Sequence, residues 1–241
     1  MLAVVDPGHG GADPGAVSAA LREKDLTLAV ALAVARELSL FRAAVRLTRQ
    51  TDAAVSLADR VEMANAVGAD LFLSVHINAG GGTGFESYVH PSADERTRQI
   101  RSAVHRKVAA VFTEAGFPDR GEKQADLYVL RRTRMPAVLL EYGFIDHPRD
   151  AAFLADAEVQ VRLARATAEG VAEAFGLSAD PSPPASSGSV GGPDLSEWAK
   201  EARDWAVRSG ISDGERPKDP ATREEVWVML HRLAKKSGAS G

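Results

Sequence analysis

Three short apolar runs each lead into a residue that could bind a metal ion or move a proton. The runs are residues 2–5, 71–75 and 137–140, and they lead to His9, His76 and Glu141 respectively. Apolar runs of this length between helical stretches predict buried strands of an α/β sheet. Because ligands bind beyond the carboxyl ends of such strands, we expect the three residues to meet at one sheet edge, as in a metal site.

Two imidazoles and one carboxylate suit a catalytic zinc ion (Zn2+), which is held by three protein ligands and keeps a fourth position open for water. The chain contains no cysteine. This leaves histidine, aspartate and glutamate as ligands and excludes disulfides and cysteine nucleophiles. His9, Glu23 and His76 would supply the set. Glu141, a separate carboxylate, would accept the proton of the water and return it to a leaving nitrogen.

Each of these residues also has a structural interpretation. Glu23 precedes a predicted helix, where the helix dipole favours a solvated carboxylate. His76 is equally compatible with a hydrogen-bonded core histidine. Glu141 is harder to explain in this way, because a carboxylate at the end of a buried strand is costly without a partner or a task. Spacing alone therefore leaves the ligand set open.

Other chemistries fit the sequence less well. The glycines around His9 allow backbone conformations that bulkier residues avoid and let a substrate approach closely. Residues 8–13 do not form a phosphate-binding loop, because they lack the third glycine of a dinucleotide motif and no Walker lysine follows. A His-Glu-x-x-His motif is also absent. The remaining histidines, predicted to be surface or structural, are His90, His105, His147 and His231.

Residues 1–176 alternate strand-like and helix-like segments, which predicts an α/β fold. We expect a twisted, largely parallel or mixed sheet with helices on both faces. Asp25 is the expected cap of the first helix, and Gly68 and Gly116 are expected to end the next two. The expected strands are 2–5, 45–47, 71–75, 84–90, 127–130 and 136–141, and the expected helices are 26–40, 55–67 and 93–115, with two short helices within 149–175.

Composition divides the chain and excludes several classes of function. The 241 residues allow a domain over 1–176, a linker rich in Ser, Pro and Gly over 177–193, and a small helical module over 194–237. The net charge of −4 argues against a nucleic-acid-binding protein. No apolar stretch is long enough for a membrane span. The first apolar run is too short for a signal peptide, so we expect synthesis in the cytoplasm without an export signal.

The order of the motifs resembles the zinc-dependent N-acetylmuramoyl-L-alanine amidases of the amidase-3 type, which cleave bacterial peptidoglycan. The resemblance covers about residues 1–176, and its motifs are jointly specific although each alone is modest. The matching segments are residues 5–11 (VDPGHGG), 23–26 (EKDL), 47–49 (LTR), 74–78 (SVHIN), 84–88 (GFESY), 129–131 (VLR) and 135–144 (MPAVLLEYGF), with Arg60, Ala64 and Asn65.

This resemblance implies that His9, Glu23 and His76 bind zinc and that Glu141 is the catalytic carboxylate. The implied reaction hydrolyses the amide between the lactyl group of N-acetylmuramic acid and L-alanine of the stem peptide. Arg49, Arg60 and Asn65 also match family positions, and we interpret them as scaffold.

Two departures from the family pattern stand out. Asp146 and His147 occupy positions where the family often has Ser-Asn, and we expect a local capping change without loss of chemistry. Some relatives carry an inserted helix that blocks the site. The chain shows no such insertion, so we expect a constitutively open cleft.

Residues 194–237 resemble a single S-layer homology motif, a type found in wall-anchoring regions. The matching parts are residues 205–206, 210–211, 213–214 and 222–225. The resemblance implies binding to a secondary cell-wall polymer. The alternative is a helical hairpin that packs on the catalytic domain or self-associates, because so small a module buries little core alone.

The sequence therefore predicts a peptidoglycan amidase, either a phage endolysin or an autolysin, that acts at the bacterial cell wall. Two alternatives stay open at this stage. One is a zinc peptidase that cuts within the stem peptide. The other is a non-catalytic wall-binding protein, although a binding protein has no need of all four residues His9, Glu23, His76 and Glu141.

Overall fold

The computed structural model describes residues 1–18 and 21–178, together with Trp205. The chain divides into two units, Met1–Ala185 and Ser186–Gly241. Apart from Trp205, every described residue belongs to the first unit. Most of the predicted linker and nearly all of the predicted module at 194–237 lie outside the described residues.

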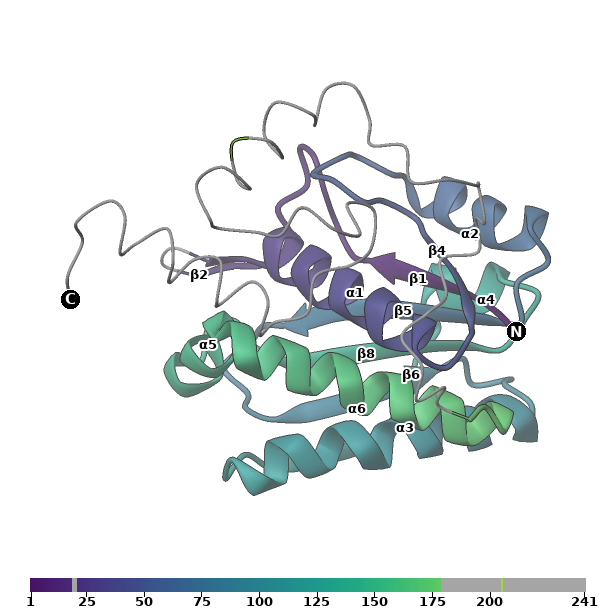
Figure 1. The fold of residues 1–241 in the computed structure, drawn as a ribbon. Coiled ribbons are helices and arrows are strands. Elements are labelled where there is room, and N and C mark those ends of the chain that lie inside the picture. The colour runs from purple at the N-terminus through teal and green to yellow at the C-terminus, as the bar shows by residue number, and fades with distance from the viewer. Residues whose placement is uncertain (19–20, 179–204, 206–241) are drawn as a thin grey trace. The chain divides into compact units, whose positions relative to one another are not determined.

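A six-stranded mixed sheet forms the centre of the first unit (Figure 1). In spatial order the sheet contains β4 (Ala44–Leu47), β1 (Leu2–Pro7), β5 (Leu71–Asn78), β8 (Ala137–Phe144), β6 (Phe85–Val89) and β7 (Asp119–Gln124). Strands β4, β1, β5 and β8 run parallel, β6 is antiparallel to β8, and β7 is parallel to β6. A separate short hairpin joins β2 (Val17–Ser18) and β3 (Leu21–Arg22).

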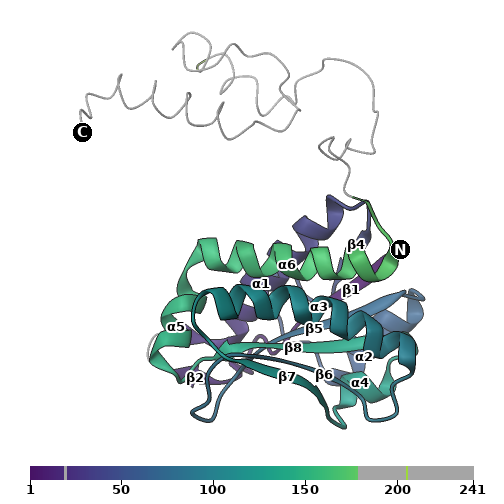
Figure 2. The ribbon, with the colours of Figure 1, turned by 90° about the horizontal axis from the view of Figure 1, so that it is seen from below.

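Helices cover both faces of this sheet, as predicted. One face packs against α1 (Glu23–Ser39), α3 (Glu95–Glu114) and α6 (Ala157–Phe175). The other packs against α2 (Leu57–Ala66) and α4 (Tyr128–Arg132) (Figure 2). The short α5 (Pro148–Ala155) joins β8 to α6. Because both faces are covered, the central strands are apolar almost throughout and not alternating, which is why they were recognisable as runs.

The structure differs from the sequence-based prediction in two elements. The segment 127–130 was expected as a strand, but residues 128–130 lie in α4 and Leu127 is the N-cap of that helix; Val129 and Leu130 pack into the apolar cluster beneath it. Strand β7 was not predicted, because its sequence DRGEKQ has no apolar residue. Its charged side chains have ionic partners on both faces of the sheet, and these replace apolar burial.

Several boundaries also differ. Helix α1 begins at Glu23, and its N-cap is Arg22 without a capping side chain; Asp25 lies in the first turn and pairs with Arg22. Helix α6 spans 19 residues and is not short. Strands β5 and β8 continue past His76 and Glu141, so these residues lie inside the strands. Within residues 1–18 and 21–178, no helix combines the length and apolar character of a membrane span.

Candidate metal centre

The sheet brings the predicted site residues together from distant parts of the chain. His9 lies two residues beyond β1, which pairs in parallel with β5, and His76 of β5 is the register partner of Glu141 of β8. Glu23 is the first residue of α1. One ligand atom from each of His9, Glu23 and His76 lies within 4.8 Å of the other two. The three predicted metal ligands therefore form one cluster, with Glu141 on the neighbouring strand.

Glu23 is the centre of this cluster. Its Oε2 lies 3.1 Å from His9 Nε2, and its Oε1 lies 3.0 Å from His76 Nδ1. The backbone N–H groups of Ala16 and Ile77 donate to the same two oxygens, at 2.9 and 3.0 Å. Glu23 is buried. Backbone donors thus fix the carboxylate, while each imidazole turns a ring nitrogen towards it.

The electrostatics of the cluster indicate where a cation would be stabilised. The hydrogen bond with Glu23 raises the pKa of His9 from 6.5 to about 9. Burial works against charge on Glu23, but the hydrogen bonds with His76 and His9 hold the pKa of Glu23 well below its usual range. Burial likewise opposes a charged His76, yet its bond to Glu23 keeps the pKa of His76 raised. Without a metal, the carboxylate is neutralised by protons on the imidazoles.

These donor atoms fit a divalent metal ion. Two imidazole nitrogens and a carboxylate converge at hydrogen-bond distances, so a cation between them would take the place of the imidazole protons. Nitrogen and carboxylate oxygen are ligands that zinc accepts, and three protein ligands are typical of catalytic zinc sites. The donor set therefore suits zinc without any rearrangement of elements.

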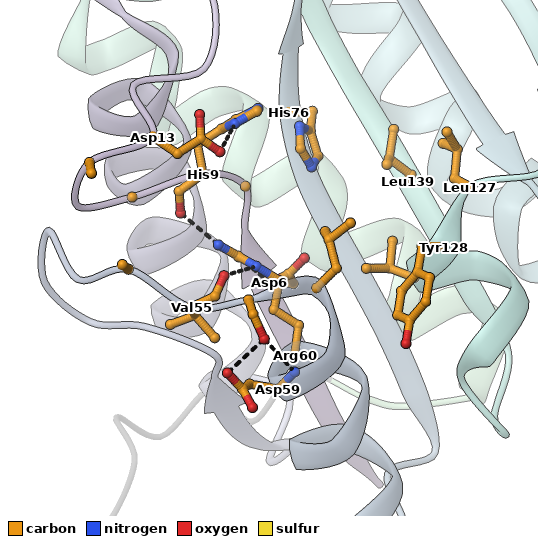
Figure 3. Close-up of a pocket in the computed structure, with 17 residues that line it drawn as sticks. Asp6, His9, Asp13, Val55, Asp59, Arg60, His76, Leu127, Tyr128 and Leu139 are labelled. Atoms are coloured by element: carbon orange, nitrogen blue, oxygen red, sulfur yellow. Dashed lines mark hydrogen bonds and ion pairs between the residues drawn. The ribbon is translucent and has the colours of Figure 1, made fainter.

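Two buried arginines hold the loop that carries His9. His9 has a left-handed backbone with φ of 61°, a conformation uncommon for residues other than glycine. Arg60 donates to the carbonyl of His9 at 2.7 Å and to that of Pro7 at 2.6 Å, and it pairs with buried Asp6 (Figure 3). Arg49 donates to the carbonyl of Gly8 at 2.8 Å. The scaffold role predicted for both arginines agrees with these bonds.

The third predicted scaffold residue, Asn65, acts elsewhere. Its amide bonds the backbone of Arg132 and Arg134, at 3.1 and 2.9 Å. Asn65 therefore connects α2 to the C-terminal end of α4 and the residues just after it, and it does not contact the loop that carries His9.

Two glycines make room for the candidate ligands. A Cβ on Gly8 would lie 2.3 Å from Cε1 of His76, and a Cβ on Gly15 would lie 2.6 Å from Glu23 Oε2. Gly15 also has a positive φ of 65°. The absence of a side chain at these two glycines thus leaves room for His76 and Glu23, whereas the close approach of a substrate to the glycines around His9 stays a prediction.

Asp13 is a partner of His9 that the sequence analysis missed. Its Oδ2 lies 2.8 Å from His9 Nδ1, on the ring nitrogen that does not face Glu23. A carboxylate on the outer nitrogen fixes the tautomer and orientation of a metal-binding imidazole. The available signal was its position four residues after His9 in the same glycine-rich loop.

Glu141 stands beside the cluster with an unsatisfied oxygen. Its Oε2 is buried and accepts no hydrogen bond from the described residues. Burial raises the pKa of Glu141 to about 7. A carboxylate with a pKa near neutrality can both accept and return a proton at physiological pH. The candidate proton-transfer group therefore lies across from His76 in the register of the sheet.

A cleft of about 770 Å³ opens next to this cluster. His9 and His76 lie on one wall, with Asp13 on the rim, and Leu127, Tyr128 and Leu139 lie across from them (Figure 3). Helix α4 supplies Tyr128, so the element that the sequence analysis misassigned is a wall of the cleft. The lining combines an aromatic and aliphatic side with a polar side that carries two of the candidate metal ligands.

The other described histidines lie outside the cluster. His147 caps α5 and pairs with Asp150, in line with the predicted capping change. His105 bonds Ser87 and Asp119 and is buried, which fits a structural histidine. His90 bonds Ser92 and Asp126. His231 lies outside the described residues.

Comparison with known proteins identifies the family. The profile of the Amidase_3 family, N-acetylmuramoyl-L-alanine amidase, matches residues 3–173. The chain is 46% identical over 176 residues to the N-acetylmuramoyl-L-alanine amidase CwlM of Bacillus licheniformis, covering 72% of this chain and 68% of that protein. It is also 46% identical over 180 residues to an endolysin of Bacillus phage SPP1, covering 73% of this chain and 66% of that one.

Solved structures agree. The catalytic domain of CwlV, an N-acetylmuramoyl-L-alanine amidase from Bacillus (Paenibacillus) polymyxa var. colistinus, superposes with a TM-score of 0.69 at 34% identity, over 73% of this chain and 99% of that domain. The Clostridium difficile 630 amidase gives the same TM-score at 32% identity, over 73% of this chain and 96% of that one. The chain therefore belongs to the Amidase_3 family of N-acetylmuramoyl-L-alanine amidases.

Proposed function

We propose that this amidase cleaves the bond between N-acetylmuramic acid and L-alanine of peptidoglycan at a zinc ion held by His9, Glu23 and His76. The observation that carries the proposal is the convergence of these three groups within 4.8 Å, beside a carboxylate on the next strand whose buried Oε2 has no hydrogen-bond partner among the described residues. When bound, zinc would supply a Lewis acid that polarises the scissile carbonyl and acidifies water.

The chain's own groups perform the remaining tasks. Glu141 takes a proton from the attacking water while the oxygen of that water forms a bond to the lactyl carbonyl carbon. The same carboxyl then gives the proton to the alanine nitrogen as the carbon–nitrogen bond breaks. Asp13 holds the outer nitrogen of His9, so that the inner nitrogen faces Glu23. Arg49 and Arg60, which donate to carbonyls of the loop that carries His9, keep this loop in place.

Substitution of Glu141 tests the division of labour between ligands and proton carrier. Glu141→Gln keeps the shape of the side chain but cannot accept a proton. We expect it to retain about one zinc per chain and to lose at least about 100-fold in kcat, the usual contribution of a general acid/base. His76→Ala, as the matched ligand variant, should lose both zinc and activity. Loss of zinc in Glu141→Gln would contradict the assignment.

The products separate this function from a stem-peptide peptidase. Hydrolysis at the proposed bond frees the N-terminus of alanine and leaves the rest of the stem intact. Mass spectrometry of digested peptidoglycan should therefore show lactyl-linked carboxylates and free alanine termini. Cleavage between two stem amino acids would favour the peptidase alternative. A protein that only binds the wall would have no need of all four residues His9, Glu23, His76 and Glu141, so this set argues against that alternative.

We also propose that the domain over 1–176 is the catalytic unit and that residues 194–237 bind a secondary cell-wall polymer. The support is the resemblance of that segment to an S-layer homology motif. Such a division suits an endolysin or an autolysin, which must stay at the wall while it hydrolyses an insoluble substrate. The wall is accordingly the proposed place of action.

A further inference from the structure

Two cations lie on β7, two strands away from Glu141, on the same face of the sheet. His76, Glu141 and Glu86 are register partners on β5, β8 and β6, so their side chains stand on one face. Arg120 of β7 donates through Nε to Glu86 Oε2 at 2.7 Å, and Lys123 bonds the same oxygen. The row from the metal ligands across the sheet thus ends in an arginine and a lysine.

Glu86 does not require both cations. It is 2% exposed, and its other oxygen accepts hydrogen bonds from Asn78 at 2.7 Å and Tyr88 at 2.6 Å. One cation on Oε2 would neutralise the carboxylate. With both cations bound, the group of Glu86, Arg120 and Lys123 carries one net positive charge, two strands away from the candidate catalytic carboxyl.

The arginine is also arranged to bind something else. Its side chain is 33% exposed and lies over the ring of Phe144, 4.7 Å from the centroid. Only its Nε is engaged: neither terminal nitrogen donates to a residue within the described part of the chain. A guanidinium is preorganised for a planar carboxylate when a ring and one ion pair fix it and when the edge formed by its two terminal nitrogens donates to no described residue.

The other charges of β7 do not compete for this face. Asp119 pairs with His105, and Glu122 pairs with Arg101. Both partners belong to α3, which covers the opposite face of the sheet. The acidic side chains of β7 are therefore turned away, while its two basic side chains remain on the cleft face.

The spacing matches a peptide that extends from the scissile bond. Adjacent strands lie about 4.8 Å apart, so the Cα of Arg120 is about 10 Å from that of Glu141, and its long side chain reaches part of the way back. Two extended residues span about 7 Å. The second residue of a bound stem peptide would thus come within reach of the guanidinium.

We propose that Arg120 binds the free carboxylate of the second residue of the stem peptide, and that Lys123 leaves it available by neutralising Glu86. This rests on the proposed function, because it assumes that the peptide half of the substrate leaves across β8 and β6. Arg120 then sets specificity: the enzyme distinguishes stems with a free carboxylate at that residue from stems with a carboxamide.

The test uses two soluble muropeptides that differ only in carboxylate or carboxamide at the second peptide residue. With zinc-loaded enzyme, KM should be about five- to tenfold lower for the carboxylate form, as expected for a partly exposed charged hydrogen bond. Arg120→Gln should abolish this difference with little change in kcat, and Arg120→Lys should keep part of it. Arg162→Gln, at a 51% exposed arginine paired with Glu114, is the matched control and should change nothing.

Equilibrium binding separates this inference from the proposed function. Calorimetry of the two muropeptides with Glu141→Gln should show the same preference in Kd, which Arg120→Gln in that background should remove. Equal Kd values for both muropeptides, or a preference that survives Arg120→Gln, would overturn the carboxylate site. Equal weakening of both by Arg120→Gln, with a lower melting temperature, would assign Arg120 to Glu86 alone. Binding with the preference but no cleavage by zinc-loaded wild type would instead refute the amidase mechanism.

Discussion

At the residue scale, the site depends on one carboxylate that serves two imidazoles. Glu23 accepts from His9, His76 and two backbone N–H groups, and it is buried. In the metal-free protein the imidazole protons balance its charge. A metal ion competes with those protons for the same atoms, so metal binding and protonation are linked.

The linkage predicts how the metal-free protein responds to pH. The raised pKa of His9 stabilises the fold fully below 6.5, and this stabilisation is lost as pH rises through about 9. The metal-free protein should therefore show a falling melting temperature between pH 6.5 and 9. Glu23→Gln, which weakens the interaction that raises the pKa of His9 most, should reduce that slope, while Asp13 remains as a second partner. A slope unchanged in Glu23→Gln would show that His9 does not cause it.

At the element scale, the site depends on the turn that follows β1, before the β2–β3 hairpin and α1. This turn places the ring of His9 5.1 Å from the ring of His76 on β5, and its close approach leaves no space for a side chain at Gly8. The carbonyls of this turn are bonded by Arg49 and Arg60, which come from beyond β4 and from α2. Packing of distant elements, not local preference, thus determines the position of a ligand.

Gly8→Ala tests this dependence. The new Cβ would meet the His76 ring at 2.3 Å, so we expect the ring to move and zinc affinity to fall at least about tenfold, with a loss of about 1–3 kcal/mol in stability. Gly68→Ala is the control: nothing lies within 4 Å of its Cβ, but its φ of 59° is costly for alanine. It should lose about 1 kcal/mol and bind zinc normally. Equal zinc affinities in the two variants would contradict the steric argument.

At the scale of the whole molecule, we propose that catalysis and wall attachment belong to different parts of the chain. The Amidase_3 profile ends at residue 173, just before the predicted linker. The described part of the chain contains the complete candidate site. The expectation that the cleft is open without an activating partner remains a prediction, and activity of the purified chain alone on peptidoglycan would agree with it.

Deletion of residues 178–241 tests this separation. Cleavage of soluble fragments should persist, because every residue of the candidate site precedes the deletion. Sedimentation with purified walls should fall at least about tenfold, since binding through the module would be lost. Glu141→Gln in the full chain, which should bind walls normally, is the control. Unchanged sedimentation of the truncated protein would remove the targeting role.

The sequence predicted the buried parallel strands β1, β5 and β8, because such strands are apolar on both faces and appear as runs. It also indicated His76 and Glu141 by their positions after such runs, and the order of motifs brought in Glu23. Strand β7 and helix α4 were beyond it, because one is stabilised by ion pairs across the sheet and the other is too short to show a helical period.

Which of these side chains contact one another follows from the tertiary structure and could not be predicted from the sequence. Glu23 ends no strand, and it meets two histidines because α1 starts at the edge where β1 and β5 end. Asp13, Glu86 and Arg120 are ordinary charged residues in sequence, and they gain meaning from what lies opposite them in space. Local patterns of apolar residues predict which segments are buried, whereas ion pairs between distant segments form only when the chain has folded.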